Sequence, residues 1–106
     1  MPFTRLGDIP QRQMLPGIKA RFVHAEKMTL SYWYLEPGAT ILPHSHAHEQ
    51  VTSLISGEME MTVGGETRAL GPGSVATIVS GVEHSVKALT ECYVIDSFCP
   101  VREDYR

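Results

Sequence analysis

Proline and glycine residues divide this 106-residue chain into segments of strand length and leave no strong helix signal. They recur at short intervals at Pro10, Pro16, Gly17, Pro37, Gly38, Pro43, Gly57, Gly64, Gly65, Gly71, Pro72, Gly73, Gly81 and Pro100. Alternating or β-branched runs lie between them and predict strands at Ile18–Ala25, Met28–Leu35, Val51–Ile55, Glu58–Val63, Val75–Val79 and Tyr93–Phe98. Short strands with frequent turn signals favour an all-β sandwich or barrel.

Local patterns add detail to this prediction. The segment Glu58–Val63 reads EMEMTV, which is typical of a strand with one solvated face. The pair Gly64-Gly65 after it predicts a two-residue hairpin. We expect one domain over residues 1–106, with residues 1–15 as an N-terminal arm that could pair with a second subunit.

Composition excludes several classes of partner. The formal net charge is −3 and Lys and Arg do not cluster, which argues against nucleic acid or a membrane surface as partner. No apolar run approaches the ~20 residues of a membrane span. The N-terminal residues MPFTRLGDIPQRQ lack the apolar core of a signal peptide, so we expect a cytoplasmic protein. Cys92 and Cys99 should point to opposite faces of one strand, and we expect no disulfide between them.

Histidines cluster in residues 38–57, GATILPHSHAHEQVTSLISG. His44 and His46 are two residues apart, so on an extended strand they share a face and can enter one cavity. Gln50 lies a further even step along and could reach the same cavity. Two converging imidazoles suit a divalent cation, although histidines also cluster by chance. Strict alternation also turns His48 inward, but three neighbouring imidazoles would crowd one ion, so we place His48 at the rim.

A third histidine follows a second strand signal. Residues 73–84 read GSVATIVSGVEH, in which a turn, a β-branched run and another glycine lead to His84. A lone histidine in a strand is usually structural, but after an HxH segment it is a natural third ligand. We therefore predict one divalent metal ion per chain, which could be Ni, Zn, Mn or Fe because this ligand set does not select among them.

These two segments resemble the motifs of the cupin superfamily. The first cupin motif, G-x5-H-x-H-x3/4-E-x6-G, is matched by Gly38, His44, His46, position 50 and Gly57, and the second by Gly73, Gly81 and His84. The resemblance spans about residues 28–98. It implies a single-domain jelly-roll barrel (a double-stranded β-helix) of two antiparallel sheets, and by analogy a homodimer.

The chain departs from the cupin motifs at three positions. Gln50 stands where most cupins have a glutamate ligand, Val79 replaces a proline and Ala88 replaces an asparagine. Three neutral histidines and a neutral glutamine leave the full charge on the metal. This favours Lewis-acid chemistry over dioxygen activation.

The C-terminal segment Ile95–Tyr105, IDSFCPVREDY, resembles the tail of the small cupins of pectin and alginate breakdown. Those enzymes convert cyclic 4,5-unsaturated uronates to linear 5-keto-4-deoxyuronate. The resemblance implies a metal held by three histidines and a glutamine, and a pocket lined by Asp96, Phe98 and Arg102. We therefore predict a metal-dependent, isomerase-like enzyme acting on a small sugar acid. In it Asp96 would carry a proton, Arg102 would bind the substrate carboxylate and Phe98 would form an apolar wall.

Other interpretations of these residues stay open. Asp96 could cap a turn or pair with Arg102, Phe98 could be an ordinary core residue, and Arg102 could be a solvated surface charge. Two other functions also fit a cupin. One is a metal-dependent dioxygenase acting on a small organic acid, and the other is a binding protein without catalytic activity.

Overall fold

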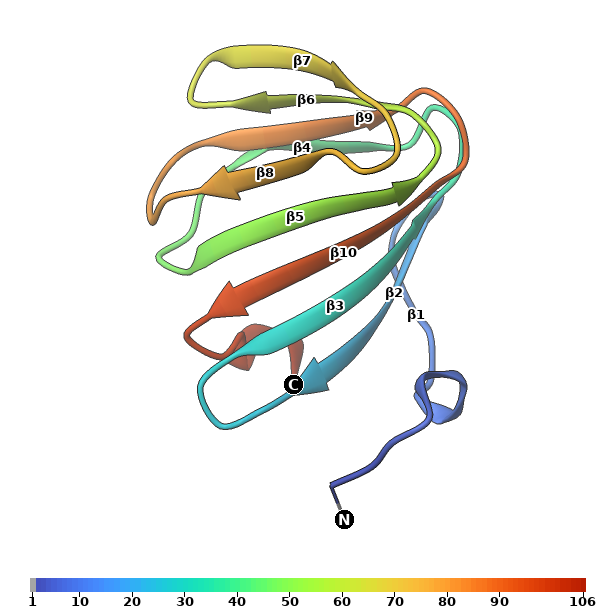
Figure 1. Ribbon diagram of the computed structural model, residues 1–106, viewed down its shortest axis with the longest axis vertical. Coiled ribbons are helices and arrows are strands. Elements are labelled where there is room, and N and C mark those ends of the chain that lie inside the picture. The colour runs from blue at the N-terminus through green and yellow to red at the C-terminus, as the bar shows by residue number, and fades with distance from the viewer. Residues whose placement is uncertain (1) are drawn as a thin grey trace.

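Ten antiparallel strands form two sheets that face each other in the computed structural model, which describes residues 2–106 (Figure 1). The larger sheet has the order β1-β2-β3-β10-β5-β8, made of β1 (Arg12–Leu15), β2 (Ile18–His24), β3 (Thr29–Leu35), β10 (Cys92–Cys99), β5 (Glu49–Ser56) and β8 (Val75–Ile78). The smaller sheet has the order β4-β9-β6-β7, made of β4 (Thr40–His44), β9 (His84–Ala88), β6 (Met59–Val63) and β7 (Glu66–Leu70). The all-β prediction with two antiparallel sheets is confirmed.

Helical structure in the described residues is limited to two 3-10 turns, η1 (Leu6–Asp8) and η2 (Glu103–Tyr105). Across residues 2–106, no helix has the length and apolar character needed to cross a membrane.

Two glycine positions show why the chain turns where it does. Gly64 and Gly65 have φ of 56° and 85° and join β6 to β7, as expected for the predicted two-residue hairpin. Gly57 has φ of 88°, and a Cβ there would lie 2.0 Å from the carbonyl oxygen of Glu91. Only glycine permits this backbone contact.

The core lies between the two sheets and follows the period of two. In β3 the buried positions alternate from Thr29 through Trp33 to Leu35. In β10 Cys92 is buried and Cys99 is exposed, so the two thiols lie on opposite faces as predicted. The methionines of β6, Met59 and Met61, are buried while the residues between and before them face solvent, which confirms one wet face for this strand.

The sequence pattern gave no residue range for four of the ten strands, although the Gly64-Gly65 hairpin implied a strand at β7. β1 falls in the segment expected to be an arm, and β1, β4 and β7 are all edge strands of their sheets. An edge strand with little buried surface carries no apolar alternation, and every residue of β7 is exposed or half-buried. β4 also contains Pro43, which an edge strand tolerates because one side of its backbone needs no ladder partner. β9 is an internal strand, but it is short and begins at His84.

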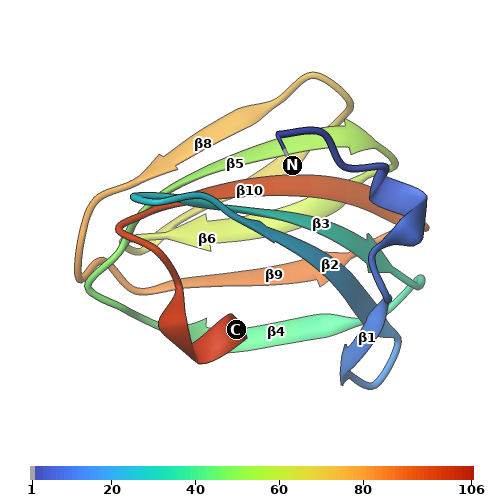
Figure 2. The same ribbon diagram turned by 90° about the horizontal axis from the view of Figure 1, so that it is seen from below.

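Strand register brings the polar residues to one end of the barrel. His44 of β4 pairs with His84 of β9, and Gln50 of β5 pairs with Phe98 of β10. The chain then continues from β10 into η2. Figure 2 shows this C-terminal segment on the side of the larger sheet where β4 also lies. The strand ends and the C-terminal segment together surround the opening of the barrel.

Candidate metal centre

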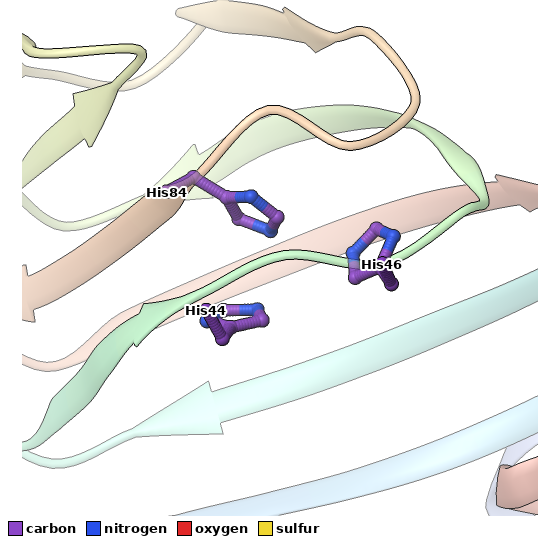
Figure 3. Close-up of side chains that lie close together, drawn as sticks. All are labelled: His44, His46 and His84. Atoms are coloured by element: carbon purple, nitrogen blue, oxygen red, sulfur yellow. The ribbon is translucent and has the colours of Figure 1, made fainter.

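Three histidines converge at this end of the barrel (Figure 3). His44 ends β4, His46 lies in the connection to β5, and His84 begins β9. One ligand atom from each lies within 4.8 Å of the other two, so the three side chains could hold a metal ion. Their exposure increases from buried His84 through half-buried His46 to exposed His44, which leaves the centre open on one side.

Backbone carbonyls fix the tautomer of all three rings. Nδ1 lies 2.9 Å from the carbonyl oxygen of Leu42 in His44, of His48 in His46 and of Val82 in His84. Because a carbonyl oxygen only accepts, Nδ1 carries the proton and the Nε2 lone pair is free. This orientation of metal-binding imidazoles by a second hydrogen bond is typical of metal sites in proteins.

The convergence of His44 and His46 was predicted, but a continuous strand does not produce it. β4 ends at His44, and its pairing with β9 shifts register between Ile41 and His44. The shift places both Ile41 and His44 on the cavity wall although they are an odd number of residues apart. His46 then reaches the centre from the irregular segment between β4 and β5.

Gln50 supplies the fourth polar group. It is 5% exposed, and its Oε1 lies 2.9 Å from Nε2 of His46 while its amide Nε2 donates to Oγ1 of Thr52 at 2.9 Å. With the His46 proton on Nδ1, two lone-pair atoms face each other across 2.9 Å. A shared cation would resolve this conflict, because two ligands at about 2.1 Å from one ion lie about 3.0 Å apart when they meet at a right angle.

The protonation states of the histidines also favour a cation at this centre. Burial lowers the pKa of His46 and of His84, so both rings are neutral near pH 7. Nε2 of His84 is buried and has no hydrogen-bond partner among the described residues. A buried lone pair without a donor is costly, and a metal ion would satisfy it. The donor set of three imidazole nitrogens and one amide oxygen therefore fits a divalent transition-metal ion.

His48 is not in the group of converging histidines found among residues 2–106. Its side chain is half-buried, and its ring centroid lies 5.6 Å from that of His46. Its backbone carbonyl accepts the Nδ1 proton of His46. The main chain of His48 thus orients a candidate ligand.

Asp96 lies two residue pairs deeper in the barrel than the pair formed by Gln50 and Phe98. It pairs with Thr52 across the sheet, and its Oδ1 is buried without a hydrogen-bond partner. Burial raises the pKa of Asp96 to about 6. Thr52, Gln50 and Arg102 act in the opposite direction without offsetting it. A carboxyl that titrates near neutral pH can both give and accept a proton.

Arg102 is buried and pairs with Asp104 of η2. The two alternative predictions for this residue, a solvated surface charge and a pair with Asp96, are therefore wrong. Arg102 is 7% exposed, with Nε and Nη2 donating to the two Asp104 carboxylate oxygens at 3.0 and 2.8 Å. These hydrogen bonds lower the pKa of Asp104. The guanidinium also lies 4.6 Å from the Phe98 ring centroid. Phe98 is itself 3% exposed and meets His46 edge-on at 5.7 Å.

Six of the seven predicted site residues line one cavity of about 210 Å³. The seventh, His46, contacts the lining residue Gln50. The cavity has a polar opening and an apolar interior that includes Met59, Met61 and Val94. Sequence reasoning did not assign Thr52, Trp33 or Tyr105 to the wall. The even step from Gln50 to Thr52 along β5 was a usable signal for Thr52, whereas Tyr105 reaches the cavity only because the chain turns back after β10.

A barrel of two antiparallel sheets with a histidine triad at one end is the arrangement of a cupin. The family model described as the cupin domain matches residues 31–98, which is more than half of the chain. The chain belongs to the cupin family.

Its relatives include pectin-degradation cupins. The pectin degradation protein KdgF of Dickeya dadantii is 31% identical over 107 residues, covering 98% of this chain and 90% of the relative. The structure of KdgF from a Halomonas species is 28% identical with a TM-score of 0.94, covering 100% of this chain and 99% of that one. An RmlC-like cupin from Shewanella frigidimarina has a TM-score of 0.95 at 24% identity, covering 100% and 96% of the two chains, and shows the fold alone.

Proposed function

We propose that this protein converts cyclic 4,5-unsaturated uronates into linear 5-keto-4-deoxyuronate, with a divalent metal ion held by His44, His46, Gln50 and His84. The observation that carries this proposal is the convergence of free Nε2 lone pairs and the Gln50 oxygen beside Asp96 and Arg102 in one cavity. Similarity along nearly the whole chain to a pectin degradation protein supports the substrate class.

The reaction is an isomerisation in which atoms balance without a co-reactant. The C1 hydroxyl loses its proton, the bond between C1 and the ring oxygen breaks, and C4 gains a proton as the enol becomes a ketone. A bound divalent ion would supply Lewis-acid stabilisation of negative charge on substrate oxygen.

The protein's own residues would bind the substrate and carry the proton. Arg102 would donate to the substrate carboxylate with the N–H groups that Asp104 does not use. Asp96, with a pKa raised to about 6, gives a proton to carbon and takes one from the hydroxyl. Such proton transfer contributes about 10²–10⁴-fold in rate. Phe98 and the apolar interior exclude water from the reacting carbons.

The test uses the ultraviolet absorbance of the 4,5-double bond. Metal-loaded protein should remove this absorbance faster than the spontaneous ring opening measured without protein. His84→Ala should lose both bound metal, by elemental analysis, and the rate enhancement. The control is His24→Ala, because His24 bonds to Thr29 and does not line the cavity.

An unchanged absorbance with fully metallated wild-type protein would refute this function. Oxygen uptake on addition of small organic acids would then favour a dioxygenase. Metal binding that survives in His84→Ala but is lost in His24→Ala would refute the assignment of the centre.

A further inference from the structure

The C-terminal residues hold Arg102 on three sides. Its Cζ atom lies against two aromatic rings, 4.6 Å from the centroid of Phe98 and 4.1 Å from that of Tyr105, and the two rings are inclined at 71° to each other. Asp104 binds Nε and Nη2 in a bidentate pair at 3.0 and 2.8 Å. A planar guanidinium that contacts two rings and is paired along one edge has lost most of its rotational freedom.

This arrangement extends across the molecule to the N-terminal edge strand. The Tyr105 ring packs on Phe22 with centroids 4.6 Å apart, and Cζ of Arg12 in β1 lies over the Phe22 ring, 4.4 Å from its centroid. Nη2 of Arg12 also donates to the backbone carbonyl of Tyr105. Two packed rings, Phe22 and Tyr105, thus connect exposed Arg12 to buried Arg102 and tie η2 to the barrel.

Backbone contacts fix the same segment. The Arg102 amide donates to Oγ1 of Thr29 at 3.0 Å, and the Tyr105 amide donates to the carbonyl oxygen of Arg102 at 3.0 Å. Arg102 and Tyr105 both line the cavity. The segment that carries the guanidinium is therefore anchored at its main chain as well as at its side chains.

We infer that Asp104 and Tyr105 are positioning residues that hold Arg102 ready for a substrate carboxylate, an inference that rests on the proposed function. Asp104 uses one edge of the guanidinium and leaves the remaining N–H groups for the cavity. A receptor fixed before binding loses little side-chain entropy when the carboxylate arrives. Asp104 and Tyr105 act through Arg102 and need not touch the substrate.

Matched variants separate positioning from folding. Asp104→Asn removes the charge that holds the guanidinium, whereas Glu103→Gln removes the same charge from an exposed neighbour that bonds only weakly to Arg106. Tyr105→Leu removes the ring that lies against the guanidinium. Asp104 has a half-exposed side chain, so loss of this charge-assisted pair should weaken carboxylate binding by about five- to tenfold.

The binding experiment needs no turnover. Trp33 is the only tryptophan and lines the cavity, so its fluorescence reports ligand binding to the zinc-loaded protein. D-glucuronate and its neutral amide, D-glucuronamide, are the probes. Asp104→Asn and Tyr105→Leu should raise the Kd for glucuronate about five- to tenfold and change that for glucuronamide less than twofold. Glu103→Gln should stay within twofold of wild type for both probes.

Kinetics and thermal midpoints complete the test. In Asp104→Asn we expect KM for the unsaturated uronate to rise while kcat and Tm stay near wild type. A purely structural role would lower Tm and weaken both probes equally, which would overturn the inference. So would equal behaviour of Asp104→Asn and Glu103→Gln, or a wild type without preference for the acid over the amide. If the acid preference holds but no turnover occurs, the proposed function fails and the positioning role stands.

Discussion

Replacing Asp96 with asparagine should make the stability of the metal-free protein less dependent on pH. Burial raises the pKa of Asp96 to about 6 in the folded protein, whereas the ordinary value is 3.8. Between pH 3.8 and about pH 6, Asp96 keeps its proton in the folded state but has lost it in the unfolded chain. Stability therefore falls as pH rises through this range, because the folded state binds more protons.

The size of the effect follows from the two pKa values. Their difference corresponds to about 3 kcal/mol, since each tenfold change in proton affinity is about 1.4 kcal/mol. This contribution is fully present below pH 3.8 and is lost above about pH 6. Asparagine has no proton to lose, so the stability of Asp96→Asn relative to wild type should increase by about 3 kcal/mol between pH 3.5 and 8.

Denaturant unfolding of chelated protein at a series of pH values would measure this difference. Subtracting wild type from Asp96→Asn cancels the titration of groups common to both, including His46 and His84. Asp8→Asn is the control, because Asp8 lies exposed in η1. A difference between wild type and Asp96→Asn that does not vary with pH would refute the argument that Asp96 is held in a desolvating site.

Three further predictions test other parts of the structure. Gln50→Glu should bind metal more tightly in a chelator competition, because it adds a negative charge at the centre, and weaker binding would contradict the ligand assignment. Gly57→Ala should destabilise the fold by about 2–4 kcal/mol in denaturant unfolding, because its Cβ would meet the Glu91 carbonyl, whereas Gly71→Ala has open space and should change stability little. Chelation should lower the thermal midpoint, because metal at one hundred times its Kd contributes about 2.7 kcal/mol, and an unchanged midpoint would argue against a folded-state metal centre.

Sequence patterns predicted strands whose side chains face the core, but not most of the edge strands. Val51–Ile55 and Tyr93–Phe98 fall within β5 and β10, which are internal strands of the larger sheet. Their apolar alternation reflects burial on one face. Glu66–Leu70 forms an edge strand with almost no buried surface, and its backbone pairing with β6 depends on a hairpin and leaves no hydrophobic pattern.

The sequence by itself determined the residue types and spacing of the centre. HxH, a glutamine four residues later and a distant histidine are local facts, and their even spacing predicted that they share one cavity. The tertiary structure decided how they meet. His44 faces His84 because the register of β4 shifts against β9, and the carbonyls of Leu42, His48 and Val82 select the tautomers. These are contacts between backbone segments, which side-chain spacing does not encode.

The tertiary structure likewise decided the surroundings of Asp96 and Arg102. The sequence placed Asp96 and Phe98 on one face of a strand, which the cavity reproduces. For Arg102 the sequence allowed three interpretations: a ligand of the substrate carboxylate, a partner of Asp96 or a solvated surface charge. Burial of Arg102 against Phe98 and Tyr105 depends on the chain turning back after β10, and its pairing with Asp104 depends on the turn of η2. These contacts form when a short C-terminal tail folds over the barrel opening. The sequence of the tail has no periodic pattern from which they could be predicted.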